Sequence, residues 1–298
     1  MLYNLLGNSG LEVSSVSFGC MSLKSADDNA GNIIKKAADS GINLFDTADL
    51  YDKGENEILL GKALKGIRNG ALISTKVGNR WKTDGSGWEW CPRKSYILEA
   101  ADQSLKRLQT DYVDLYLLHG GTIEDPADEC IEAFERLKEQ GKIRAYGISS
   151  IRPNVICNYV KRSQISAVMT QYSLLDRRPE EKTLELLGEN NIGVLARGTI
   201  ASGLLVNKPA KKYLEYSEDE ISQMLEKFSA IFTDEHQRQK AAIGYALANP
   251  AISSAVAGIR TGAQLEQALE AAKRHSLSES DFQVLKQLFP IAQYQEHR

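Results

Sequence analysis

Four side chains that can carry out acid–base chemistry stand at or near the ends of apolar runs. Asp46, Lys76 and His119 each close such a run, and Tyr51 follows the first of them in a loop. If each run is a strand of a β/α barrel, the side chains at its carboxyl end face the bowl where such barrels carry out their chemistry. We therefore expect these four residues to share one site.

The four residue types suit the delivery of a proton to a carbonyl oxygen. A tyrosine hydroxyl is a weak acid near neutrality, and a neighbouring ammonium such as that of Lys76 favours its ionised form. Asp46 would hold Lys76 charged and fixed, and His119 would donate a hydrogen bond to the carbonyl oxygen or help to move the proton. Taken singly, each residue also fits a non-catalytic role. It could be a solvated residue at a strand end or, for His119, a core histidine whose hydrogen bonds are all made within the protein. Their joint placement favours catalysis.

The elements that would position these residues form a regular series. Short apolar runs alternate with amphipathic stretches, which is typical of repeated βα units and a parallel sheet. The predicted strands are residues 16–19, 43–46, 72–76, 113–119, 145–149, 167–171, 193–197 and 254–258. The predicted helices include residues 32–40, 95–108, 128–140, 180–190 and 237–248. Eight such alternations in 298 residues favour an α/β fold of the closed (β/α)8 TIM-barrel type over an open doubly wound sheet.

No linker, repeat or low-complexity tract divides the chain, so we predict a single domain over residues 1–298. Residues 3–6 and 11–13 flank a turn at 7–10 and predict an N-terminal β-hairpin, a candidate plug for the bottom of the barrel. Two loops, 77–94 and 202–234, are long enough to carry function or act as a lid, and the second is expected to include helical pieces.

Composition excludes several classes of function. The chain has 42% hydrophobic and 25% charged residues with a net charge of −3, so neither a nucleic-acid-binding face nor a membrane-binding patch is expected. With no leader and no apolar stretch long enough to span a membrane, we predict a cytoplasmic protein whose partners are small molecules. The four cysteines are scattered, as in a reduced protein, and His236, His275 and His297 lie in stretches that look helical or terminal, so no metal site is expected.

Several ordered motifs resemble signatures of the aldo-keto reductase superfamily. They are Phe45-Asp46-Thr47-Ala48-Asp49-Leu50-Tyr51, Ser74-Thr75-Lys76, Asp114-Leu115-Tyr116-Leu117-Leu118-His119, and the segments 6–13, 141–149 and 258–260. The resemblance spans nearly the whole chain. It implies a β/α barrel that binds extended NADPH and transfers a hydride to the carbonyl group of an aldehyde or ketone. It also implies a catalytic tetrad of Asp46, Tyr51, Lys76 and His119, with Tyr51 as the general acid and His119 orienting the carbonyl.

The same resemblance carries over a set of cofactor positions. They are Gly19, Cys20, Met21, Asp46, Ser149, Ser150, Gln171, Arg197, Gly198, Thr199, Ile200, Gly258, Arg260, Gln264 and Gln267. Arg260 stands at a helix start in the segment that resembles the family's 2′-phosphate site, and a helix N-terminus with an arginine is suited to an anion, which favours NADP over NAD.

The sequence departs from the family pattern at several of these positions. Ser150 replaces the usual asparagine, and the glutamine of the sixth strand is shifted to Gln171, leaving Met169 in its place. Because residues 169 and 171 share a face of a strand, the resemblance implies that Gln171 reaches the nicotinamide from one step further along. Arg197 replaces a stacking tyrosine and could stack or pair with phosphate, its alternative being a lid salt bridge. Gln267 is followed by alanine where the family has asparagine, so one adenine contact is lost.

The substrate itself is less clearly specified. Together with Tyr51 and His119, all three tryptophans, Trp81, Trp88 and Trp90, are candidates to contact it, because aromatics at a barrel mouth would form an apolar wall. Their alternative role is to anchor the long loop. A rival function is an NADPH-binding regulatory or channel-associated module with little turnover, and a metal-dependent barrel enzyme is the weakest alternative. The oligomeric state is open.

Overall fold

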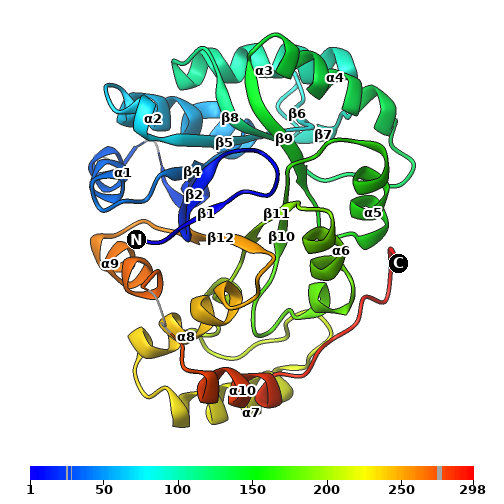
Figure 1. Cartoon of the computed structure of the whole chain (residues 1–298). Coiled ribbons are helices and arrows are strands. Elements are labelled where there is room, and N and C mark those ends of the chain that lie inside the picture. The colour runs from blue at the N-terminus through cyan, green and yellow to red at the C-terminus, as the bar shows by residue number, and fades with distance from the viewer. Residues whose placement is uncertain (25, 28, 274–276) are drawn as a thin grey trace.

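The computed structural model describes residues 1–24, 26–27, 29–273 and 277–298. Eight parallel strands close into a barrel, and helices surround it (Figure 1). In barrel order the strands are β3 (Val16–Gly19), β4 (Leu44–Asp46), β5 (Leu72–Val77), β8 (Val113–Leu118), β9 (Ile143–Ser149), β10 (Ala167–Gln171), β11 (Gly193–Arg197) and β12 (Ile252–Gly258). The predicted (β/α)8 class is confirmed, and every predicted strand is present within two residues at either end.

The helices follow the strands in chain order. They are α1 (Ala30–Asp39), α2 (Glu55–Leu64), α3 (Lys94–Leu108), α4 (Ala127–Glu139), α5 (Pro153–Arg162), α6 (Thr183–Glu189), α7 (Glu218–Ile231), α8 (Glu235–Leu247), α9 (Gly262–Ala271) and α10 (Glu279–Leu288). The described part of the chain holds no helix long and apolar enough to cross a membrane.

The core has two layers, because a barrel strand is buried on both of its faces. Side chains such as Phe18, Ile73 and Val168 pack outward against the helices, whereas Leu117 and Leu195 belong to a smaller cluster inside the barrel. This double burial explains why the strands appear in the sequence as nearly continuous apolar runs. It also explains why an ionisable residue at the end of such a run indicates the rim of the barrel.

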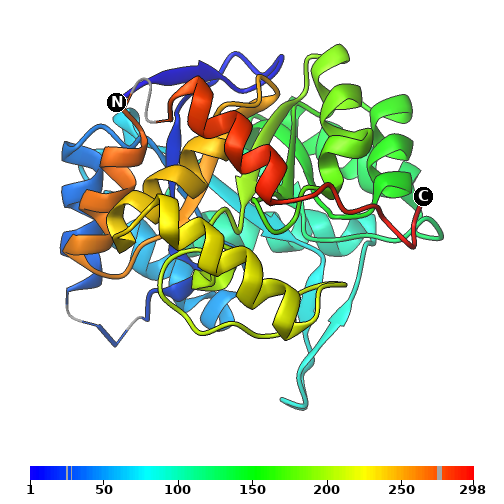
Figure 2. The ribbon, with the colours of Figure 1, turned by 90° about the horizontal axis from the view of Figure 1, so that it is seen from below.

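The predicted N-terminal hairpin closes the amino-terminal end of the barrel. Strands β1 (Tyr3–Leu5) and β2 (Glu12–Ser14) pair in antiparallel fashion and cross that end (Figures 1 and 2). Leu6, Leu11 and Val13 are fully or almost fully buried and join the cluster inside the barrel. The hairpin is also tied to the last strand, since Ser253 Oγ donates to the Leu5 carbonyl at 3.0 Å.

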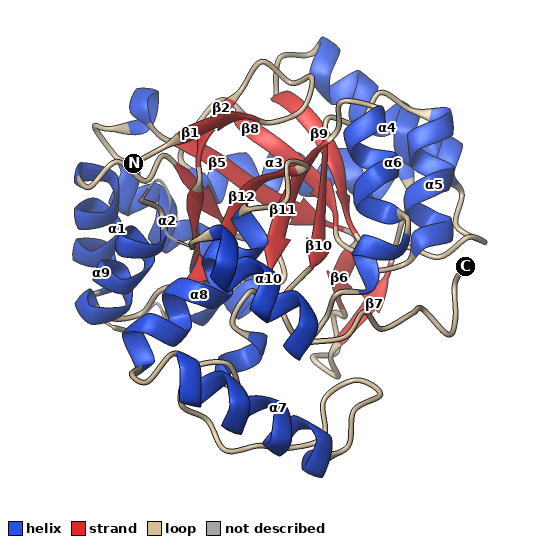
Figure 3. Cartoon of the chain, turned by 60° about the horizontal axis from the view of Figure 1, so that its bottom comes forward, coloured by secondary structure: helices blue, strands red, loops and turns tan. Residues whose placement is uncertain are grey.

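The long loop after β5 contains structure that was not predicted. Strands β6 (Asn79–Trp81) and β7 (Trp88–Trp90) form a second hairpin, in which Trp81 stands opposite Trp88. Figures 2 and 3 show that it projects from the body at the end opposite the N-terminal hairpin. The β-forming tryptophans flanking a turn with two glycines, Gly85 and Gly87 at φ of +75° and +128°, are consistent with this outcome.

The loop after β11 is partly helical, as expected. It begins with a short 3-10 helix, Ala201–Gly203, and later contains α7. Helix α7 starts at a capping box, in which Ser217 Oγ accepts from the Glu220 amide and the Glu220 carboxylate accepts from the Ser217 amide. Helix α7 packs against α10, outside the ring of barrel helices (Figure 1).

Candidate active site

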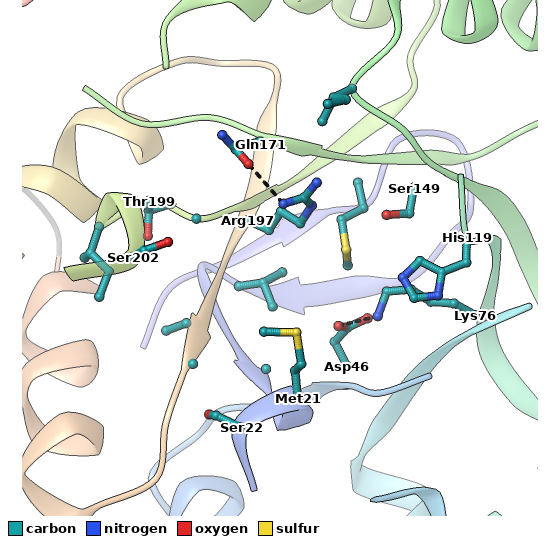
Figure 4. A pocket seen from close by; sticks show the side chains of 18 of the residues that line it. Met21, Ser22, Asp46, Lys76, His119, Ser149, Gln171, Arg197, Thr199 and Ser202 are labelled. Carbon is teal, nitrogen blue, oxygen red and sulfur yellow. Dashed lines mark hydrogen bonds and ion pairs between the residues drawn. The ribbon is translucent and has the colours of Figure 1, made fainter. Parts of the chain in front are cut away.

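A cavity of about 760 Å³ opens at the carboxyl ends of the strands. Its size lies within the range of ligand pockets in proteins. Its wall includes all four residues proposed for catalysis, Asp46, Tyr51, Lys76 and His119. Figure 4 shows Asp46, Lys76 and His119 together on one side of the cavity, with Gln171 and Arg197 across from them.

The register of neighbouring strands brings Asp46 and Lys76 together. Asp46 ends β4 opposite Ser74 of β5. Lys76 is two residues after Ser74 in β5, so its side chain lies on the same face of the sheet. The Lys76 Nζ atom donates to Asp46 Oδ2 at 2.7 Å, to the Thr47 carbonyl at 2.7 Å and to the Tyr51 hydroxyl oxygen at 3.2 Å. An ammonium has three N–H donors, and all three are used here. Lys76 is therefore held in one orientation against Tyr51.

The environment of Lys76 keeps its charge. Burial opposes the charge, since the side chain is 1% exposed, but the Asp46 carboxylate and the Tyr51 oxygen outweigh that effect. The pKa of Lys76 therefore lies above its ordinary value. A fixed ammonium beside the Tyr51 oxygen is the arrangement that stabilises negative charge developing on that atom.

His119 stands immediately beyond β8, where its amide donates to the Val77 carbonyl at 2.7 Å. Its ring meets the Tyr51 ring edge to face, with centroids 5.9 Å apart. Burial, assisted by the positive charges of Lys76 and Arg197, lowers the pKa of His119 to about 3. His119 is therefore neutral near pH 7 and offers one N–H donor and one acceptor.

The backbone after Tyr51 turns sharply. Tyr51 opens the short 3-10 helix Tyr51–Gly54, inside which Asp52 and Lys53 have φ of +49° and +54°. Left-handed backbone in residues other than glycine is uncommon and costs free energy, which the surrounding structure must offset. At Gly54, with φ of +90°, a Cβ atom would lie 2.7 Å from the Arg107 side chain. The turn therefore depends on glycine at residue 54.

Two buried carboxyl groups lie behind the tetrad. Glu57 is held by Thr75 Oγ1 at 2.6 Å and by Arg107 Nε at 2.7 Å. Asp49 is less well satisfied: its Oδ2 accepts a 3.5 Å bond from Tyr96, and its Oδ1 is buried without a side-chain partner among the described residues. Burial, reinforced by nearby Glu57, raises the pKa of Asp49 to about 8.

Asp49 is expected to make the stability of the protein depend on pH. Because its pKa is higher in the folded than in the unfolded chain, its contribution to the free energy of unfolding falls as the pH rises from about 4 to about 8. Asp49→Asn should therefore raise the free energy of unfolding by about 1–3 kcal/mol at pH 9 and leave it nearly unchanged at pH 4. Urea unfolding at both values measures this difference. Asp111→Asn, at an exposed carboxylate, is the control, and an equal effect of both substitutions would contradict the prediction.

Most residues assigned to the cofactor by resemblance line the same cavity. Those in its wall, besides Asp46, are Gly19, Met21, Ser149, Ser150, Gln171, Arg197, Gly198, Thr199, Ile200, Gly258 and Gln264. Cys20, Arg260 and Gln267 are outside it. The Cys20 side chain is 1% exposed and packs in the outer core. Burial raises the pKa of the Cys20 thiol, so Cys20 is an uncharged core residue whose side chain points away from the cavity.

Gln171 and Arg197 are fixed by each other. Arg197 Nη1 donates to Gln171 Oε1 at 3.2 Å (Figure 4). The Gln171 Nε2 atom donates to Asp176 at 2.8 Å and to the Tyr213 hydroxyl at 3.1 Å. Met169 also lines the cavity, so residues 169 and 171 share a face, as the strand alternation predicts. Whether Gln171 contacts a nicotinamide stays a prediction.

Arg260 lies just before helix α9, beyond the cavity wall. Its side chain is exposed, and no hydrogen bond or ion pair of its guanidinium is found within the described ranges. Its amide donates to Gln264 Oε1 at 2.8 Å, and the Gln264 amide donates to the capping residue Thr261 at 3.2 Å. Gln264, which lines the cavity, thus connects it to the Arg260 segment.

The three tryptophans lie outside the cavity wall. Trp90 packs over Gly78 and donates to both oxygens of Asp125 at 3.0 Å, and Trp88 is 51% exposed. Trp81 lies under the ammonium of Lys53 at 5.4 Å. These contacts match the alternative that the tryptophans anchor the long loop. Whether the tryptophans also contact a substrate stays a prediction.

Several cavity residues were not predicted from the sequence. They are Ser22, Leu50, Gly120, Gly121, Ile151, Arg152, Ser202, Tyr213, Gln239, Ile243, Val256 and Ala257, in addition to Met169, which was named only as a replacement. Leu50 and Gly120 adjoin the predicted site residues Tyr51 and His119, and Arg152 is two residues after Ser150, so counting up to four residues past each strand would have found them. Tyr213, Gln239 and Ile243 belong to the segment after β11 and to α8, and no local pattern marks them. Where the structure describes the chain, no group of three or more His, Cys, Asp or Glu side chains is placed to hold a metal, and His275 lies outside the described residues.

Comparison with known proteins agrees with this architecture. The sequence pattern of the Aldo/keto reductase family matches residues 15–289. The uncharacterised oxidoreductase YqkF of Bacillus subtilis is 46% identical, over 98% of this chain and 98% of its own length. The solved structure of aldo-keto reductase AKR11C1 from Bacillus halodurans in its holo form superposes with a TM-score of 0.94 at 46% identity, over 100% of this chain and 99% of that one. The apo form of the same protein superposes with a TM-score of 0.85 at 41% identity, again over 100% and 99% of the two chains.

Proposed function

This chain belongs to the aldo/keto reductase family and is an oxidoreductase, and we propose that it reduces aldehydes and ketones with NADPH, using Tyr51 as the proton donor. The observation that carries this proposal is the Lys76 ammonium, held by Asp46 and Thr47 at 3.2 Å from the Tyr51 oxygen in the wall of the cavity. No other arrangement around this cavity combines an acidic hydroxyl with a fixed buried cation within the described residues.

The proton transfer follows from these contacts. As the substrate carbonyl oxygen gains negative charge, the Tyr51 O–H bond breaks and the proton passes to that oxygen. The Lys76 ammonium donates to the Tyr51 oxygen and stabilises the phenolate that remains. Because Asp46 keeps Lys76 charged and in place, this stabilisation is present before the reaction begins. When bound, NADPH supplies the hydride that adds to the carbonyl carbon.

His119 complements Tyr51 at the carbonyl oxygen. Its lowered pKa, about 3, makes the ring neutral, so it can donate one hydrogen bond without adding a second positive charge beside Lys76. Its Nδ1 atom is buried and has no partner within the described ranges. The nitrogen that can meet a substrate is therefore Nε2, which is not among the buried unpartnered atoms.

The residues of the cavity fit a nicotinamide cofactor. Ser149 offers a hydroxyl for a carboxamide, and Gln171 offers the second lone pair of its Oε1, since both of its N–H donors are used by Asp176 and Tyr213. Arg197 offers positive charge for a phosphate or a planar face for a ring. Arg260, whose exposed guanidinium lies at the start of α9, is proposed to hold a 2′-phosphate.

The first test is NADPH oxidation by the native protein with para-nitrobenzaldehyde, a reactive neutral aldehyde. Turnover with NADPH supports the proposal. Tight NADPH binding without reduction of this or other reactive aldehydes would contradict it and would favour the regulatory alternative, in which the barrel binds the cofactor without acting as an efficient enzyme.

Arg260→Gln should weaken NADPH binding selectively. Losing a charge-assisted contact to phosphate is expected to raise the Kd for NADPH about tenfold or more and to leave the Kd for NADH within about twofold. Titration of cofactor fluorescence measures both constants. Arg93→Gln, on the exposed surface at the start of α3, is the matched control. Equal weakening of NADPH and NADH by Arg260→Gln would show that this residue does not select for the 2′-phosphate.

A further inference from the structure

The cavity wall carries more positive than negative charge. Among the residues that the structure describes, its positively charged side chains are Lys76, Arg152 and Arg197, and its negatively charged side chain is Asp46. Lys76 is paired with Asp46, and Arg197 is hydrogen-bonded to Gln171. Arg152 is the remaining cation, and neither the proton relay nor the cofactor positions use it.

Arg152 is held at one edge of its guanidinium and free at the other. Its Nη1 atom donates to the Gly121 carbonyl, and its amide donates to Ser150 Oγ at 3.1 Å. Across the described part of the chain, no acceptor is found for its Nε or Nη2 and no carboxylate forms an ion pair with it. Neither atom is among the buried unpartnered atoms, so this edge is accessible. The Nε and Nη2 atoms form the planar fork that binds a carboxylate through two parallel hydrogen bonds.

A carboxylate lies near Arg152 but is committed elsewhere. Asp125 Oδ2 is 3.6 Å from the position of a Cβ on Gly121, the residue whose carbonyl Arg152 binds. Both oxygens of Asp125 accept from Trp90 Nε1 at 3.0 Å, and Oδ2 also accepts from the Thr122 amide at 2.6 Å. Asp125 thus anchors the β6–β7 hairpin and forms no ion pair with the Arg152 fork among the described residues.

The position of Arg152 points to the substrate end of the cavity. Gly121, which binds its Nη1, is two residues beyond His119, so the two Cα atoms are at most about 8 Å apart. Gly120 and Gly121 have φ of +134° and +126° and no side chains, and both line the cavity. Leu50 and Ile151 add apolar surface to the same wall. A ligand whose carbonyl lies at Tyr51 and His119 therefore has Arg152 within the length of a small molecule.

We propose that Arg152 binds a carboxylate of the substrate, so that the preferred substrates are aldehydes or ketones carrying a carboxylate a few atoms from the carbonyl group. This inference rests on the proposed reductase function. It assigns to Arg152 a role in binding and selecting the substrate, and it leaves the proton relay at Tyr51 unchanged.

The test compares two substrates of the same shape and different charge. Para-carboxybenzaldehyde carries a carboxylate where para-nitrobenzaldehyde carries a neutral nitro group, and each is assayed with saturating NADPH. The native enzyme should show a KM for the carboxylate about tenfold or more below that for the nitro compound. Arg152→Gln should remove this difference by raising the KM for the carboxylate about tenfold or more, with its kcat and both constants for the nitro compound within about threefold.

Three further measurements separate the outcomes. Arg152→Lys keeps the charge without the fork and should retain part of the preference. Arg162→Gln removes a cation from the exposed C-terminal end of α5, the helix that Arg152 precedes, and should leave the preference unchanged. A rise in the Kd for NADPH in Arg152→Gln without loss of the carboxylate preference would assign this residue to the cofactor and overturn the inference. Absence of the preference in the native enzyme would overturn it while leaving the reductase function intact, and absence of turnover with both aldehydes would instead contradict the function on which it rests.

Discussion

Replacing Tyr51 with phenylalanine is expected to lower kcat for para-nitrobenzaldehyde by about 10²-fold or more, because the carbonyl oxygen loses its general acid. The substitution removes one oxygen atom from a side chain in the cavity wall and leaves the aromatic ring, which meets His119 edge to face, in place. The Kd for NADPH should therefore stay within about threefold of the native value, while kcat and kcat/KM fall together.

Steady-state NADPH oxidation at saturating cofactor measures this effect, and fluorescence titration measures cofactor binding. The matched control is Tyr3→Phe, which removes a hydroxyl that donates to the Gly41 carbonyl, remote from the cavity in the N-terminal hairpin. Tyr3→Phe should leave kcat unchanged. If Tyr51→Phe kept more than about a third of native kcat, another group would have to supply the proton, and the assignment of Tyr51 would be wrong.

The second large effect concerns Lys76, for which activity and stability should change together. Lys76→Met removes the cation that faces the Tyr51 oxygen and leaves the Asp46 carboxylate, 6% exposed, without its partner. Breaking a buried ion pair from one side costs about 3–5 kcal/mol of stability, because the remaining charge stays desolvated and uncompensated. We expect that loss in the free energy of unfolding, and a fall in kcat of about 10²-fold or more.

A double substitution separates the two effects. Asp46→Asn combined with Lys76→Met leaves no uncompensated charge, so most of the lost stability should return, while kcat should stay as low as in Lys76→Met. Urea unfolding and NADPH oxidation on the three proteins give the comparison. A double variant that regained activity along with stability would show that Lys76 acts by maintaining the fold and has no direct role at Tyr51.

Much of the fold was predictable because barrel strands are buried on both faces. Segments such as 167–171 and 193–197 are short apolar runs bounded by polar residues, and the structure has strands at those same positions. The tetrad was predictable for a related reason, since an ionisable residue that ends such a run must lie at the rim of the barrel. Resemblance to a family then supplied roles for residues that the pattern alone had placed.

The remaining features depend on tertiary structure that local patterns do not encode. Gln239 reaches the cavity from helix α8, and Tyr213 reaches it from the segment after β11. Neither lies near a predicted strand end, and only the closed barrel brings them to the same wall. Cys20 and Met21 illustrate a finer limit, because adjacent residues in one turn were assigned to the cofactor together. Cys20 packs into the core, whereas Met21 is 67% exposed and lines the cavity.

The N-terminal hairpin also bears on the order in which the molecule assembles. Asn4 Nδ2 donates to the Ser253 carbonyl at 2.9 Å, and Ser254 Oγ donates to the Ser14 carbonyl at 2.7 Å, so the hairpin is secured by β12, 240 or more residues further along the sequence. Contacts this distant along the chain make folding slow, because most of the polypeptide must be ordered before they form. Until β12 closes the barrel, we expect Leu6, Leu11 and Val13 to lack their full set of buried neighbours. Such an intermediate is prone to aggregate. The yield of native protein on refolding should therefore fall as the protein concentration rises.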